Sequence, residues 1–153
     1  MIIKNIRGIL DKIEAIKMKL LMIYADEFNY KTSNKTLDMV EEYQQSRLVK
    51  DTLVGFIQVE KEDEEQMEKV ETKLVKNLKW AAKKNNTNNI VLHSFAHLSL
   101  SKAEPKVTIK IFNNAEQRLA DAGYCASQTP FGYFLDLDLK APGRSLARVF
   151  KEF

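Results

Sequence analysis

Two short apolar runs flank a long amphipathic stretch in the middle of this chain. Residues 53–59 (LVGFIQV) and 89–95 (NIVLHSF) have the length and composition of buried strands. Between them, residues 66–84 repeat apolar side chains at helical spacing, with lysines on the opposite side. A second helical pattern follows Pro105 and ends at Gly123, as a glycine just past the last turn would end it. We therefore predict an α/β or α+β fold, with a mixed β-sheet and flanking helices.

Shorter segments complete this prediction. Residues 19–24 form an apolar run of strand length that residues 25–27 close, and residues 30–37 form a second, weaker strand. Residues 133–140 (YFLDLDLK) alternate strictly, which predicts a half-buried strand with its leucines on a core face. Residues 145–150 are compatible with a last short helix.

Size, charge and cysteine content exclude several classes of protein. At 153 residues, 44% of them hydrophobic, the chain suits one domain, and no run approaches the roughly 18 apolar residues of a membrane span. The net charge of +3 is compatible with a nucleic-acid partner but too small to argue for one. The acidic run 60–65 is interpreted as a solvated loop that opens the following helix. The single cysteine, Cys125, excludes a disulfide framework, favours a cytoplasmic location and is expected to pack as a small hydrophobic side chain.

Isoleucines recur at four-and-three spacing over the first 17 residues, which predicts an amphipathic helix. Three interpretations stay open. The helix docks on its own domain, which we favour, or it dimerises, or it is an extension upstream of a true start at Met18. In each case, we expect residues 18–153 to form a single domain.

Side chains with catalytic potential are few. His93 lies inside a predicted strand and is interpreted as having no chemical role. His97 lies just past the end of that strand, where open α/β sheets bind ligands, although a loop hydrogen bond is an equally good interpretation. Zinc is not expected, because no cysteine or acidic partner stands at ligand spacing. The chain has no phosphate-binding glycine loop and no nucleophile elbow, so we expect no cofactor, no nucleotide enzyme and no nucleophilic hydrolysis.

Two loops remain as the candidate site. They are SFAHLS at 94–99 and TPFGY at 129–133, and each lies at the end of a predicted strand. In the second loop, Pro130 and Gly132 specify a particular turn. The loops offer backbone N–H and C=O groups, one imidazole, and the aromatic rings of Phe95, Phe131 and Tyr133. Such groups suit the recognition of a nucleoside or an aminoacyl ester.

Four motifs follow one another along the chain. They are MKLLMIYADEFNY from Met18, LVGFIQVEKEDE from Leu53, NIVLHSFAHLS from Asn89 and TPFGY from Thr129. In this order they resemble the archaeal editing domain of threonyl-tRNA synthetase, over residues 18 to about 150. The resemblance implies a D-aminoacyl-tRNA deacylase-like fold, a homodimer, and hydrolysis of serine wrongly attached to threonine tRNA. Because no catalytic domain follows in this chain, it also implies a free-standing domain that acts in trans, beside a threonyl-tRNA synthetase lacking its own editing domain.

The resemblance also implies a set of site residues. The catalytic residue is His97, and the substrate-binding residues are Val59, Phe95, Ala96, Pro130, Phe131, Gly132, Tyr133, Phe134 and Leu135. The chain departs from the family at three positions, because the family has tyrosine, lysine and glutamate where this sequence has Phe134, Leu135 and Arg148. Only His97 survives among the functional side chains.

Three hypotheses of function follow. The first is a deacylase that removes serine from threonine tRNA with reduced or altered activity, since one lost charge-assisted contact costs roughly two to three decades in rate. The second is a catalytically degenerate module that binds the tRNA end or a synthetase, with Arg144 and Arg148 adding phosphate contacts. The third is an assembly protein that dimerises through the isoleucine helix.

Overall fold

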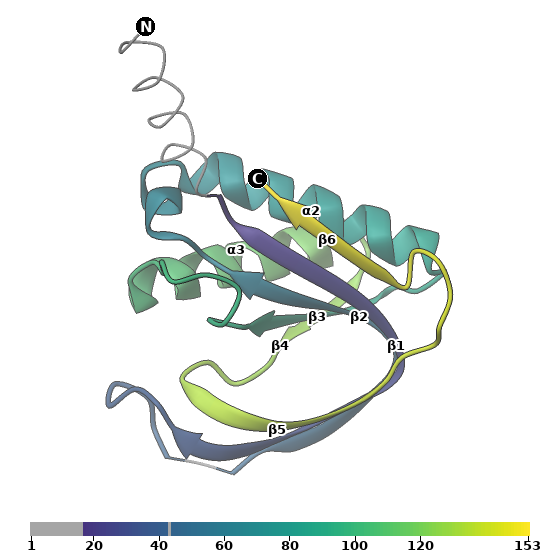
Figure 1. The fold of residues 1–153 in the computed structure, drawn as a ribbon, viewed down its shortest axis with the longest axis horizontal. Coiled ribbons are helices and arrows are strands. Elements are labelled where there is room, and N and C mark those ends of the chain that lie inside the picture. Colours follow the sequence, from purple (N-terminus) through teal and green to yellow (C-terminus); the bar gives the residue numbers. More distant parts are fainter. Residues whose placement is uncertain (1–16, 43) are drawn as a thin grey trace, which may run out of the picture.

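A mixed sheet with two covering helices forms the body of the molecule (Figure 1). The computed structural model describes residues 17–42 and 44–153. Strands β2, β3 and β4 run parallel, whereas β5 and β6 both pair with β1 in the antiparallel sense, as β2 does. The strand order is β4-β3-β2-β1-β5, with β6 beside the first half of β1. The elements are β1 (Lys19–Lys35), β2 (Ser46–Gln58), the 3-10 helix η1 (Lys61–Glu65), α2 (Met67–Lys84), β3 (Asn89–Ser94), α3 (Pro105–Asp121), β4 (Cys125–Gln128), β5 (Tyr133–Lys140) and β6 (Arg148–Glu152).

Helices α2 and α3 cover one face of this sheet (Figure 1). The apolar stripe predicted for α2 is buried there against leucines of β1 and β2. Gly55 of β2 permits the close approach of α2, because a Cβ at this position would lie 2.9 Å from Leu78 Cδ2. Gly123 follows α3 with φ of 91°, as predicted for a glycine that ends a helix. The prediction of a mixed sheet with flanking helices is confirmed.

The opposite face of the sheet is concave. Figure 1 shows β5, the second half of β1 and the first half of β2 curling beneath β3 and β4. A second hydrophobic cluster fills this concave side and is made of buried Ala25, Phe28, Tyr30, Val54, Phe56 and Val91, with Leu135 and Leu139 of β5 packed against it. The curl therefore brings β5 opposite β3 and β4, across this cluster (Figure 1).

The predicted break at residues 25–27 is wrong, because β1 is one strand of 17 residues. Its pairing with β2 continues through this segment, where Ala25 lies opposite Thr52 and Glu27 opposite Lys50. The buried side of the strand changes here, since Ala25 and Phe28 both belong to the concave cluster. The charged side chains at 26 and 27 thus mark the place where the buried side of a continuous strand changes, and not the end of the strand.

The predicted C-terminal helix is also wrong. Residues 148–152 form β6, which pairs with residues 19–23 of β1. Just before it, Ala147 is fully buried and its carbonyl accepts a hydrogen bond of 2.8 Å from Tyr24 N–H. The edge of β1 offers backbone groups that need partners, and pairing with it overrides a local helical preference.

The acidic run 60–65 is not a solvated loop throughout. Glu60 is fully buried and Asp63 is 4% exposed. Asp63 Oδ2 accepts a hydrogen bond of 2.8 Å from Glu60 N–H, and Lys19 Nζ lies 2.9 Å from Glu60 Oε1. Glu60 and Asp63 therefore form the capping box of η1, and Glu60 also pairs with a lysine. A run of like charges does not reveal these roles.

Three further predictions concern the N-terminal segment, the cysteine and membrane spans. Residues 1–16, which carry the predicted isoleucine helix, lie outside the described residues. Cys125 is exposed, so the prediction that it packs as a hydrophobic side chain is wrong. Among the residues described, no helix is long and apolar enough to cross a membrane.

Candidate functional site

The concave side of the sheet holds a cavity of about 450 Å³, which is within the range of small-molecule sites. Its wall comes mainly from the AHLS loop (residues 95–104) after β3, the PFGY turn (residues 130–133) after β4, and β5. Residues 57–59 at the end of β2, residues 36–37 after β1 and the first turn of α3 complete it. All ten site residues expected from the sequence line this one cavity, namely Val59, Phe95, Ala96, His97, Pro130, Phe131, Gly132, Tyr133, Phe134 and Leu135.

The PFGY turn is held on two sides. Thr129 N–H donates to Leu92 O at 3.0 Å, which ties the start of the turn to β3. Gly132 O accepts from Thr36 N–H at 2.6 Å, which ties its end to the segment after β1. Gly132 has φ of 86°, a backbone conformation that favours glycine. A Cβ there would also lie 2.9 Å from Val40 Cγ1, so glycine is required for two separate reasons.

A row of rings leads from the core to the mouth of the cavity. Phe56 lies 5.2 Å from His93 and 5.4 Å from Phe95, both edge to face, and Phe95 lies 5.1 Å from His97. Phe95 N–H donates to Ile57 O at 3.0 Å, so β2 fixes the start of the AHLS loop. Of these rings, only His97 is exposed, and its imidazole is therefore open to a ligand.

His93 lies on the cavity wall, although no chemical role was expected for it from the sequence. Its Nδ1 is 2.8 Å from Thr129 Oγ1, so it links β3 to the residue before the PFGY turn. Burial lowers the pKa of His93 to about 4, which keeps the imidazole neutral at neutral pH. No local signal in the sequence marks its position, because its neighbours Phe56 and Thr129 come from other segments of the chain.

The AHLS loop is anchored to the end of β2. Ser99 Oγ donates to the buried Glu60 Oε2 at 3.1 Å, and Gln58 Nε2 donates to Ser101 O at 2.7 Å. Ala103 N–H donates to Val59 O at 2.9 Å. These bonds fix the loop, and thereby His97, relative to the sheet.

Gln58 and Lys102 are among the cavity-lining residues that were not expected from the sequence. Gln58 is 2% exposed, and its Oε1 has no hydrogen-bond partner within the part of the chain that the structure describes. Lys102 is an exposed cation at the cavity edge. Neither shows in the sequence, because both depend on how the loop folds back over β2.

Apolar side chains of β5 form the wall opposite the AHLS loop. Leu135 and Leu137 line the cavity, and Leu137 is 40% exposed. The prediction that the β5 leucines lie on a core face therefore holds for Leu135 and Leu139 only, which pack against the concave cluster. Phe134 is 60% exposed at the cavity edge.

The two arginines considered as phosphate contacts lie elsewhere. Arg144 stacks on Tyr24 at 4.7 Å, and its Nη2 is 3.5 Å from Asn85 Oδ1, beyond the end of α2. Arg148 pairs with Ile23 at the start of β6. Neither residue lines the cavity. Within residues 17–42 and 44–153, no three His, Cys, Asp or Glu side chains are grouped so as to hold a metal ion.

Two buried groups have opposite effects on stability in acid. His93 binds its proton less readily when folded, with pKa about 4 against an ordinary 6.5, so its contribution grows as pH rises between these values. Burial raises the pKa of Asp63 to about 6 from 3.8, helped by the charges of Glu60 and Glu62. The contribution of Asp63 is therefore present at about pH 4 and is lost as pH rises through 6.

We expect these two effects to be separable by urea unfolding between pH 4 and pH 6.5. In wild type the two effects oppose each other across this window. In Asp63→Asn only the effect of His93 remains, so the unfolding free energy should rise from pH 4 to pH 6.5 by about 3 kcal/mol more than it does in wild type. For His93→Gln, the unfolding free energy should fall relative to wild type by a similar amount. Two variants whose curves run parallel to that of wild type would contradict this assignment.

Comparison with known proteins agrees with the motif order. The family model described as the Archaea-specific editing domain of threonyl-tRNA synthetase matches residues 18–153. A threonine--tRNA ligase of Methanosphaera stadtmanae is 36% identical over 134 residues, and one of Thermococcus sibiricus is 33% identical over 135 residues. Each match covers 86% of this chain but 22% of the relative, so the chain spans about a fifth of the curated relatives it matches.

A solved structure shares the fold. The c-Myc DNA Unwinding Element Binding Protein matches with a TM-score of 0.62 at 11% identity, over 88% of this chain and 98% of that protein. At this identity, the likeness shows the fold alone, and it agrees with the fold class predicted above. From the family match and the relatives together, the chain belongs to the archaeal editing-domain family of threonyl-tRNA synthetase.

Proposed function

We propose that residues 18–153 act as a single editing domain that hydrolyses serine from mischarged threonine tRNA in trans. The observation that carries the proposal is the cavity, in which the AHLS loop and the PFGY turn meet. The family relation supports a tRNA editing role. The chain would work in the cytoplasm as a homodimer, beside a threonyl-tRNA synthetase that lacks its own editing domain.

In this proposal, the terminal adenosine binds among Val59, Phe95 and Ala96, and the aminoacyl group reaches the PFGY turn. Backbone N–H groups and the ring edges orient the ester, and His97 holds the substrate or the attacking water at the cavity mouth. The water oxygen bonds to the ester carbonyl carbon, and the bond from that carbon to the ribose oxygen breaks. A proton of the attacking water passes to the ribose oxygen, which leaves as the hydroxyl, while serine leaves as the free acid.

The supporting residues of the chain hold the two loops in position. Neutral His93 holds Thr129 next to the turn, and Glu60 holds Ser99 within the loop. Such a site orients its substrate without a side chain that must gain or lose a proton. A slow but selective hydrolase is the expected consequence, because Leu135 supplies no cation to the developing negative charge.

A binding module is the second candidate. The observation that favours it is the apolar β5 wall, where Leu135 and Leu137 face a cavity that would hold a polar ester. A module of this kind would bind the tRNA end or a synthetase partner without hydrolysing the ester.

The two candidates differ in one assay. Purified protein is mixed with seryl-tRNA and threonyl-tRNA for threonine, and ester loss is followed against a control without protein. Selective loss of the seryl ester is the expected result. If both esters stay intact, and a triple variant with Leu135→Lys, Phe134→Tyr and Arg148→Glu is inert as well, the hydrolase is excluded and the binding module stands.

A further inference from the structure

One side of α2 carries five exposed lysines and one exposed tryptophan. At 100° per residue, the positions 69, 73, 76, 80, 83 and 84 fall within an arc of about 100°. All six side chains are exposed. The lysine face consists of Lys69, Lys73, Lys76, Trp80, Lys83 and Lys84.

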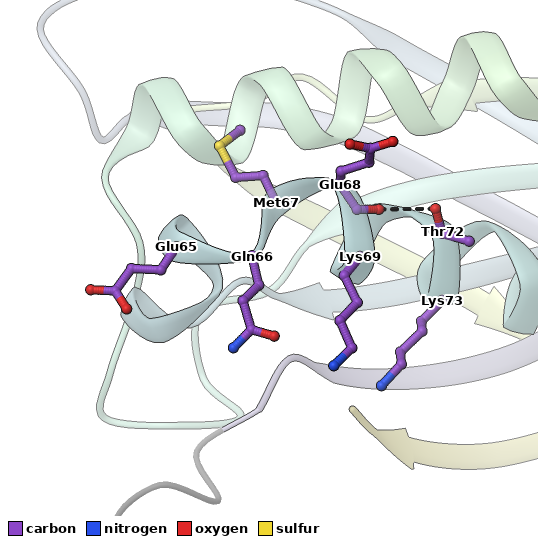
Figure 2. Close-up of a pocket in the computed structure, with 7 residues that line it drawn as sticks. All are labelled: Glu65, Gln66, Met67, Glu68, Lys69, Thr72 and Lys73. Carbon is purple, nitrogen blue, oxygen red and sulfur yellow. Dashed lines mark hydrogen bonds between the residues drawn. The ribbon is translucent and has the colours of Figure 1, made fainter.

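The acids of α2 lie beside the lysine face and not within it, although Glu68 lines one open hollow together with Lys69 and Lys73. The helix has two glutamates, Glu68 and Glu71, and both fall outside the arc. Glu71 is buried and lies 3.2 Å from Arg118 Nη1, so it is already paired on the far flank. Figure 2 shows Lys69 and Lys73 extending to one side of the helix and Glu68 to the other.

The charge of the molecule is concentrated on this helix. Helix α2 has six lysines against two glutamates, a surplus of four positive charges, while the whole chain carries a net +3. The remainder of the chain is thus close to neutral. The lysine face is therefore a local concentration of positive charge and not part of a generally basic surface.

An aromatic ring is set among the lysines. Trp80 is 38% exposed, and Lys151 of the neighbouring strand β6 lies 5.6 Å from its ring centroid. An exposed tryptophan surrounded by cations offers a ring for stacking and several charges for phosphates. This combination distinguishes the lysine face from a helix side that is merely solvated.

We propose that the lysine face binds the phosphate backbone of tRNA. The proposal rests on tRNA as the substrate of the proposed function, and it adds a second contact, because no residue of the lysine face lines the cavity. From Lys69 to Lys84 the face is about 22 Å long, at 1.5 Å per residue, so it reaches several consecutive phosphates. A second copy of this chain does not fit, since two lysine faces would repel one another.

Phosphate contacts of this kind fix orientation and carry no sequence information. The lysine face would hold the body of the tRNA while the cavity selects the amino acid. Such a division suits an editing domain that acts in trans, because it must recapture the tRNA without the rest of a synthetase.

The test is tRNA binding at several salt concentrations, with an unmodified threonine tRNA transcript as the probe. The variant Lys69→Gln/Lys73→Gln/Lys76→Gln removes three charges from the lysine face. A control variant, Lys31→Gln/Lys50→Gln/Lys110→Gln, removes three exposed lysines elsewhere. Thermal melting of both variants shows whether they remain folded.

We expect the lysine-face variant to lose on the order of 100-fold in affinity at about 0.1 M salt, and to lower the slope of log affinity against log salt by about two. The control variant should bind nearly as wild type does. Binding of tRNA does not require hydrolysis. This result would therefore support the lysine-face proposal even if the protein did not hydrolyse seryl-tRNA. Equal losses in the two variants, or no loss in the lysine-face variant, would overturn the proposal and leave the face to an acidic protein partner.

Discussion

Replacing Leu135 by lysine should raise the kcat/KM for seryl-tRNA hydrolysis on the order of 100-fold. Leu135 lies on the cavity wall, in the strand that faces the AHLS loop. A lysine there would bring an ammonium group into a partly desolvated cavity, where one charge-assisted contact to the developing oxyanion is worth about 3 kcal/mol. Single-turnover kinetics with excess protein measures this gain without interference from product release.

A control on the same strand separates a local contact from added charge. Leu139 packs against the same concave cluster but does not line the cavity. We expect Leu139→Lys to leave hydrolysis close to the wild-type rate, although it adds the same charge to the same side of β5. If Leu135→Lys gains no more than Leu139→Lys, the chemistry does not take place beside β5.

Replacing Lys19 by methionine should destabilise the fold by about 3 kcal/mol at neutral pH. Glu60 is fully buried, and the Lys19 ammonium lies 2.9 Å from its carboxylate. Without that lysine, the carboxylate stays in the interior without an opposite charge, which costs far more than loss of an exposed pair. Chemical denaturation measures the change, and the melting temperature should fall by roughly 6–12 °C.

The chain contains its own comparison for this ion pair. Lys140 and Glu27 lie 3.8 Å apart with both side chains well exposed, so Lys140→Met should cost less than about 1 kcal/mol. In the double variant Lys19→Met/Glu60→Gln, the buried charge is gone and most of the lost stability should return. Equal costs for Lys19→Met and Lys140→Met would show that Glu60 does not depend on its partner.

Periodic patterns in the sequence predicted the elements whose packing is local. The stripe of α2, the end of α3 before Gly123 and the turn at Gly132 were found because each depends on residues close together in the chain. The length of β1 and the identity of β6 were not found, because both follow from pairing between distant segments. Local propensity does not contain that information.

The candidate site divides in the same way. Motif order was sufficient to name ten residues, and the fold brings all ten to one cavity. His93 was missed because its burial depends on Phe56 in another strand, and Glu60 was misjudged because its partners Lys19 and Ser99 are about 40 residues away. Charge and exposure of such groups are set by tertiary contacts that sequence spacing does not encode.

The central claim is that the cavity between the AHLS loop and the PFGY turn holds the aminoacyl end of tRNA. A crystal structure with a non-hydrolysable analogue, 3′-deoxy-3′-(seryl)amino-adenosine, tests it most directly. The account predicts adenine beside Val59 and Phe95, with the seryl group between His97 and Tyr133. An analogue bound elsewhere on the protein, or no binding at millimolar concentration, would contradict it.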